Sequence, residues 1–310
     1  MVTRVLVGEL GEGVRHGVRS GLAATRRRVR NALRLALRTT AGRIGLPIVL
    51  LHLTLALIGQ WLAPYSATHI PAPLQEFQLL PPSLQFWLGT DEFGRDVLSR
   101  VMSGATSLIV VSVAGSTLGI FLGTVVGMSS GYKGGRVDEV VMRVMDGLMA
   151  FPGLLLALLV LTTLGSSQVN IVATMGIVTM PSVSRVIRST TLSLKTLEFV
   201  QSARLRRESA PYIIFREILP NTLPVLGVEM SVRLSYAILT VSSLGFLGLG
   251  IQPPSSDWGL MISQSRRFLV MAPWVALAPM AAVASLVVGV NLLADGIRQG
   301  GRLAREEEQR

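Results

Sequence analysis

Six apolar runs, each long enough to cross a bilayer as a helix, constrain the fold of this chain more than any other feature. They occupy residues 44–62, 105–128, 145–164, 169–187, 222–247 and 271–293. A helix needs about 20 apolar residues to span the hydrocarbon core of a membrane. Half of the residues are hydrophobic and only 15% are charged, which excludes an ordinary soluble domain. The sequence therefore predicts an all-α, polytopic membrane protein with six transmembrane helices.

Lysine and arginine are distributed unevenly among the segments that connect these runs. Of the 29 Lys and Arg residues, 24 lie in or beside the two terminal segments and alternate connections. Four lie in the other connections, and Arg233 lies inside a run. Positively charged loops stay on the cytoplasmic side of a membrane. We therefore expect a multi-pass protein of the cell (plasma or inner) membrane with both termini in the cytoplasm.

The same pattern divides the chain into four parts. Residues 1–43 form a basic N-terminal segment, and residues 44–104 contain the first helix and an exoplasmic loop. Residues 105–296 form a core with five helices, and residues 297–310 form a cytoplasmic tail. Within the N-terminal segment, residues 29–37 fit either a short amphipathic helix on the membrane surface or a disordered tail, and the sequence leaves both open.

Composition argues against several other classes of function. The net charge of +11 would suit a nucleic-acid partner, but the basic residues flank apolar runs and aromatic residues make up only 5% of the chain. There is no cysteine, and His16, His52 and His69 are too scattered to form a metal site. We expect no nucleic-acid partner, metal or cofactor. His52 lies inside the first run and is expected to pack or to join two helices by a hydrogen bond.

Several local patterns predict how the helices are built. Glycines recur every four residues in the second run, at Gly115, Gly119, Gly123 and Gly127, and predict a flat face for another helix. The polar stretch 131–146 is expected to be a tight turn. Pro152 should kink the third helix, and Glu229 and Arg233, four residues apart, should form a salt bridge.

A polar, basic insert at residues 198–224 separates the fourth and fifth runs. Its apolar residues recur at helical spacing on both sides of Pro211, which predicts two short amphipathic helices joined near Ser209–Pro211. Pro220 and Pro224 are expected to mark the start of the fifth run. By spacing alone, a solvated, positively charged connecting loop is the slightly favoured interpretation.

The stretch 87–105, WLGTDEFGRDVLSRVMSGA, closely resembles the Gly-Thr-Asp-x-x-Gly-Arg-Asp signature of dipeptide, oligopeptide and nickel permeases of ATP-binding-cassette (ABC) importers. The matching residues include Asp91, Gly94, Arg95 and Asp96. From local physics, Thr90 or Asp91 is expected to cap a helix here. The segment is expected to be an exoplasmic structural cap that does not bind substrate.

The basic insert is similar to the cytoplasmic loop of such permeases, whose pattern is Glu-Ala-Ala, a later Gly, and Ile-x-Leu-Pro. The matching residues are Gln201, Ser202, Ala203, Arg207 in the place of Gly, Ile218, Leu219 and Pro220. The resemblance implies that residues 188–219, which we call the coupling loop, hold a helix that fits a groove of the ATPase subunit, with Leu205 near the contact. Because Arg lacks the freedom of Gly at positive φ, we expect the turn at Arg207 to be built differently.

The resemblance covers residues 86–296 and implies a type I ABC-importer permease. The implied partners are a second homologous permease, two ATPase subunits that bind ATP, an extracytoplasmic binding protein and the lipid bilayer. No P-loop occurs in the chain, so ATP is expected to be hydrolysed elsewhere. The expected cargo is a di- or oligopeptide, with nickel or another small solute as the alternative. An intramembrane serine enzyme is a weaker rival, because GMSSG (127–131) and His52 make a poor catalytic pair. A structural membrane scaffold is a third option, and it would lack the helical insert that this chain has at residues 198–224.

Overall fold

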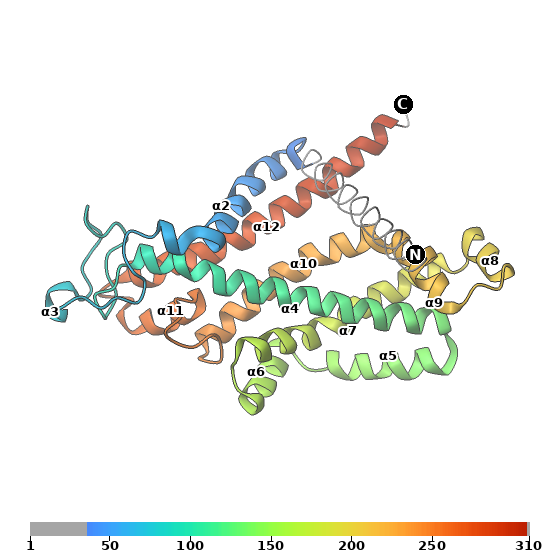
Figure 1. Cartoon of the computed structure of the whole chain (residues 1–310), viewed down its shortest axis with the longest axis horizontal. Coiled ribbons are helices and arrows are strands. Elements are labelled where there is room, and N and C mark those ends of the chain that lie inside the picture. The colour runs from blue at the N-terminus through green and yellow to red at the C-terminus, as the bar shows by residue number, and fades with distance from the viewer. Residues whose placement is uncertain (1–35, 309–310) are drawn as a thin grey trace, which may run out of the picture. The chain divides into compact units, whose positions relative to one another are not determined.

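The computed structural model describes residues 36–308, with side chains up to Arg302 (Figure 1). Most of the predicted amphipathic segment 29–37 lies outside this range. The described chain divides into two compact units, one comprising residues 48–291 and the other residues 36–47 and 292–308. In the smaller unit Thr39 donates a hydrogen bond to the Ala36 carbonyl, and Gly42 lies against Gly296.

The described part of the chain is almost entirely helical, as predicted. The long helices are α2 (Thr40–Leu62), α4 (Val97–Lys133), α7 (Gln168–Leu194), α10 (Leu219–Phe246) and α12 (Pro273–Glu308). The shorter ones are α3 (Leu74–Phe77), α5 (Gly135–Met149), α6 (Gly153–Leu164), α8 (Glu198–Leu205), α9 (Ala210–Tyr212), the π-helix η1 (Ile213–Ile218), α11 (Trp258–Ser265) and the 3₁₀-helix η2 (Arg266–Phe268). Five helical segments are long and apolar enough to cross a membrane, or up to six if α5 and α6 count as one broken span.

Helices α4 and α7 form the most extensive pair in the larger unit, because glycine lets their backbones approach closely (Figure 1). A Cβ atom added at Gly119 would lie 2.6 Å from the Cβ of Thr179, and one at Gly123 would lie 2.6 Å from the Cβ of Val183. These contacts are too short for any residue other than glycine. The prediction of a flat glycine face on the second span is therefore confirmed.

The third span differs from its prediction in two ways. The stretch expected to be a tight turn is the helix α5, and Pro152 does not merely kink the helix that follows. It separates α5 from α6, whose axes differ by 86°. The physical reason is that Phe151 precedes proline and is disfavoured in the helical conformation, while Pro152 itself is extended, with ψ of 127°.

The opposite outcome occurs at the fifth span. Pro220 and Pro224 were expected to mark its start, but the helical segment runs without a break from Ala210 to Phe246. A proline ring crowds the carbonyl four residues earlier, which for Pro220 is that of Arg216. The π-helical turn η1 contains Arg216, and its wider backbone makes room for the ring.

Buried side chains form two clusters in the larger unit. One contains Trp258, whose indole nitrogen donates to the Val101 carbonyl at 2.8 Å. The other lies beside α8 and contains Met128, Val183, Ile187, Val200, Ala203, Ile213 and Ile218. The second cluster positions the coupling loop, because it joins residues of α4, α7, α8 and η1.

Candidate functional site

Helix α8 is an eight-residue helix that ends in a complete Schellman motif. The amide of Glu208 donates to the Ala203 carbonyl at 3.1 Å, and the amide of Arg207 donates to the Arg204 carbonyl at 2.9 Å. Arg207 adopts a φ of 58°, the left-handed conformation. Glycine is the usual residue at this position of the motif. The expectation that Arg207 could not adopt positive φ was wrong, because the two hydrogen bonds offset a conformational cost of about 1–2 kcal/mol.

The coupling-loop residues singled out from the sequence separate into exposed and buried sets. Gln201, Ser202, Arg207 and Pro220 are exposed, and Leu205 is 86% exposed. Ala203 and Ile218 are fully buried in the cluster beside α8, and Leu219 is half-buried. The exposed set can meet a partner protein, whereas Ala203 and Ile218 attach the loop to the rest of the chain.

Three polar contacts fix α8 to neighbouring elements. The Arg204 guanidinium lies over the ring of Tyr132, at the end of α4, and Gln201 donates to the Lys195 carbonyl at 3.0 Å. Arg206 lies 3.6 Å from both Glu208 and Glu217, which joins the loop to η1. The second helical piece begins at Ala210 and is capped by Ser209, whose hydroxyl accepts from the Tyr212 amide. Two helical pieces joined at Ser209–Pro211 are thus confirmed, although the second is continuous with α10.

Ion pairs that sequence reasoning missed hold α5 against α7. Arg188 donates from two nitrogens to the two carboxylate oxygens of Asp138, and Arg185 pairs with Asp146. In addition, Lys195, at the end of α7, donates a hydrogen bond to the carbonyl of Gly131, in the last turn of α4, at 2.8 Å. The partners are 39 to 64 residues apart in the chain. The only signal available in the sequence was the matched set of acidic and basic residues in 138–146 and 185–195.

The signature segment, residues 89–96, is a compact turn organised by the buried Asp91. One Asp91 oxygen accepts from the amides of Phe93 and Arg95 at 2.8 and 2.9 Å. The other accepts from the side chains of Arg95 and Arg100. Asp91 and Arg95, four residues apart, form an ion pair at 2.8 Å, and the pair lies in a turn and not in a helix. This arrangement fits a structural role, because the Asp91 carboxylate is saturated by groups of its own segment.

Asp96, rather than Thr90 or Asp91, caps the helix that follows. Its Oδ2 accepts from the Ser99 amide at 2.8 Å and from the Ser99 hydroxyl at 2.6 Å, and α4 begins at Val97. Thr90 is instead used within the turn, where its hydroxyl donates to the Phe77 carbonyl. Gly94, with φ of 70°, packs against Phe77 and Pro71. Helix α4 therefore begins at Val97, eight residues before the predicted start of the second span at residue 105.

Two further polar groups inside the predicted spans behave as expected. His52 contacts the carbonyls of Ile48 and Ala282 at 2.8 and 3.2 Å through its two ring nitrogens, which joins two helices. Glu229 and Arg233 form the predicted ion pair at 2.9 Å.

Outside the spans, Asp257 caps α11, and burial raises its pKa to about 6.

Comparisons with known proteins identify the family of this chain. Residues 115–300, more than half of the chain, match the family "Binding-protein-dependent transport system inner membrane component". The chain is 38% identical to the glutathione transport system permease protein GsiD of Pectobacterium atrosepticum, over 81% of this chain and 82% of that protein. It is 39% identical to the protein of the same name from Escherichia coli O6:K15:H31, with the same shares covered.

The family match contains α8, η1 and the α5–α7 ion pairs, and the two relatives extend the similarity to most of the chain. The chain therefore belongs to the family of binding-protein-dependent transport system inner membrane components, and it is a permease subunit of an ABC importer of the peptide and nickel type.

Proposed function

We propose that this permease forms half of the translocation pathway for small peptides. The observation that carries the proposal is the 38% identity, over 81% of the chain, to a permease whose name specifies glutathione, itself a tripeptide. Nickel or another small solute is the alternative, because the signature segment resembles that of nickel permeases as well. In either case this chain would carry out no chemistry and hold no cofactor.

The proposed assembly contains a second, related permease, two ATPase subunits that bind ATP, and an extracytoplasmic binding protein. Both termini lie in the cytoplasm in this proposal, which the uneven distribution of Lys and Arg supports. The coupling loop then faces the ATPase subunits and the signature segment faces the opposite side. Helix α8 ends in the exposed Leu205, and an exposed apolar side chain suits a protein groove better than water.

Uptake of labelled substrates tests the proposed cargo. The permease, reconstituted in proteoliposomes with its ATPase and binding-protein partners, should take up glutathione or a dipeptide such as alanyl-alanine when ATP is supplied. Uptake of ⁶³Ni²⁺ with no peptide uptake would refute the peptide cargo and favour the alternative. Omission of the binding protein is the control, and it should abolish uptake.

Cysteine cross-linking tests the coupling role of α8. Leu205→Cys should cross-link to an ATPase subunit, because its side chain is exposed. Ala203→Cys is the matched control two residues earlier, and it should not react, because that position is buried in the chain's own cluster. Labelling of Leu205→Cys by an impermeant thiol reagent added outside intact cells would contradict the proposed orientation.

A further inference from the structure

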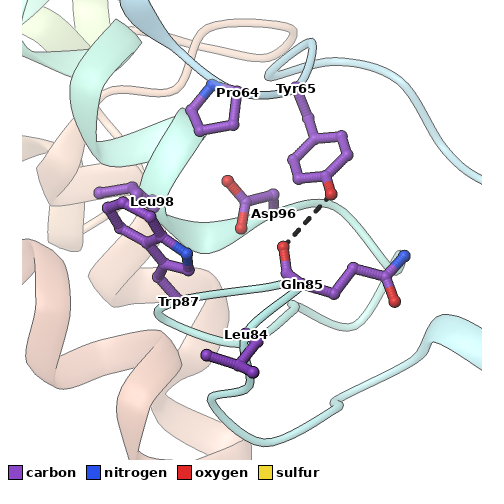
Figure 2. A pocket seen from close by; sticks show the side chains of 7 residues that line it. All are labelled: Pro64, Tyr65, Leu84, Gln85, Trp87, Asp96 and Leu98. Carbon is purple, nitrogen blue, oxygen red and sulfur yellow. Dashed lines mark hydrogen bonds between the residues drawn. The ribbon is translucent and has the colours of Figure 1, made fainter.

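A small cavity lies beside the start of α4 and has no assigned role. Its volume is about 220 Å³, and Figure 2 shows the side chains that surround it. The lining residues are Pro64, Tyr65, Leu84, Gln85, Trp87, Asp96 and Leu98. The cavity thus combines two aromatic rings, aliphatic side chains and one carboxylate.

Asp96 is the only acidic residue that lines the cavity, and its side chain lies among the other lining residues in Figure 2. Only 3% of the surface of Asp96 is exposed to solvent. Its Oδ2 is occupied by the Ser99 amide and hydroxyl. Its Oδ1 accepts no hydrogen bond from any residue within 36–308. One carboxylate oxygen therefore remains available to a ligand in the cavity.

The charge of Asp96 is not balanced by a neighbouring cation. The two arginines closest in sequence, Arg95 and Arg100, both pair with Asp91. Across the described range, Asp96 takes part in no ion pair. Within the described range, only the Ser99 amide and hydroxyl at the start of α4 offset the cost of burying the Asp96 carboxylate. A cation in the cavity would offset that cost.

The aromatic residues make an organic cation a better fit than a metal ion. Tyr65 is held in place because its hydroxyl donates to the Gln85 carbonyl at 3.2 Å and its ring packs on Phe86. Trp87, across the cavity in Figure 2, is 69% exposed. Aromatic faces attract ammonium groups within about 6 Å of the ring centre. A metal ion would need several oxygen ligands, and no group of three metal-ligating side chains occurs in the described part of the chain.

We propose that the cavity between Tyr65, Trp87 and Asp96 binds a primary ammonium group. The ammonium group would donate to Asp96 Oδ1 and lie against the rings of Tyr65 and Trp87, while its alkyl part contacts Leu84. Two kinds of ligand contain a primary ammonium group: a peptide, at its free amino terminus, and phosphatidylethanolamine, in its headgroup. The ligand chemistry follows from the cavity alone, so it does not depend on the transport function proposed above.

Saturation-transfer NMR with ethylammonium tests the proposal on the full-length permease in nanodiscs of phosphatidylglycerol. Ethylammonium should bind the wild type, and Asp96→Asn should weaken binding about tenfold or more, because the charge is lost. Asparagine still caps a helix well, so α4 should keep its start. Trp87→Leu, which leaves the cap untouched, should also weaken binding, whereas Glu76→Gln, an exposed acid in the same loop, should not.

Two further arms distinguish the sources. Displacement of ethylammonium by glycylglycine, but not by N-acetyl-glycylglycine, identifies a peptide amino terminus. Displacement by phosphatidylethanolamine added to the nanodiscs identifies a lipid headgroup, and either result supports the site. No ethylammonium binding, or equal binding by wild type and Asp96→Asn, overturns the proposal. These outcomes are independent of the uptake assay, so the two proposals can fail separately.

Discussion

The guanidinium carbon of Arg204 lies 5.2 Å from the centre of the Tyr132 ring. This contact joins α8, the exposed helix of the coupling loop, to the last turn of α4. Because α4 also packs along most of α7, a displacement of α8 has a direct route to two long helices of the larger unit. Packed contacts of this kind are how small shifts at one site move rigid elements elsewhere.

Arg204→Ala should loosen α8 from α4. A cation–π contact at an exposed site contributes about 0.5–1 kcal/mol, so we expect a two- to fivefold loss in substrate transported per ATP hydrolysed. Tyr132→Leu should have a similar effect, and the double variant should be no worse than either single one. Additive losses in proteoliposomes would show that the two side chains act separately.

Arg207→Gly should stabilise the permease. Glycine adopts positive φ without the cost that Arg207 carries at 58°, so we expect a gain of about 1 kcal/mol in the free energy of unfolding. The matched control is Arg207→Ala, which removes the same charge but keeps a Cβ atom. Thermal unfolding in detergent should separate the two variants, and equal melting temperatures would contradict the role of backbone strain.

Gly123→Ala should destabilise the packing of α4 on α7. The added Cβ would lie 2.6 Å from the Val183 Cβ and 2.9 Å from the Met180 carbonyl oxygen, which forces the helices apart. Overpacking of this kind costs about 1–3 kcal/mol. Gly147→Ala, in α5, is the control, because nothing lies within 4 Å of its added Cβ. It should be neutral or slightly stabilising.

Asp138→Asn should destabilise the attachment of α5 to α7. The change leaves the Arg188 guanidinium, two-thirds buried, without its bidentate partner. We expect a loss of about 1–3 kcal/mol, below the range for fully buried pairs. Glu139→Gln is the control, because Glu139 and its partner Arg143 are mostly exposed and 3.9 Å apart. Denaturant titration of both variants measures the loss in the free energy of unfolding. Equal losses in the two variants would contradict a special role for the Asp138–Arg188 pair.

Asp257 should make stability fall as pH rises. Burial raises its pKa to about 6 in the folded protein, against 3.8 for a free carboxyl. The folded state therefore binds the proton more tightly, and stability decreases between about pH 4 and pH 6, by roughly 3 kcal/mol at most. Asp257→Asn keeps an acceptor for the Leu260 amide and should remove this part of the pH dependence. An unchanged slope of stability against pH in the variant would contradict the assignment.

The sequence by itself determined the class of fold and much of the local structure. Apolar runs predicted the long helices, because a chain in a bilayer must satisfy its backbone hydrogen bonds within each helix. The spacing of glycines predicted the flat face of α4, and the four-residue separation predicted the Glu229–Arg233 pair. Each of these depends on residues within a few turns of one helix, where sequence and position are directly related.

Only the tertiary structure decided where the helices are interrupted and which residues far apart in the sequence contact one another. Pro152 separates two helices, whereas Pro220 lies inside a continuous helical segment, just after a π-helical turn. The backbone of Arg207 adopts the left-handed conformation, because the two hydrogen bonds of the Schellman motif outweigh the preference of a non-glycine residue for negative φ. The Asp138–Arg188 pair joins residues 50 apart. Its formation depends on how α5 packs on α7, and local spacing in the sequence carries no record of that packing.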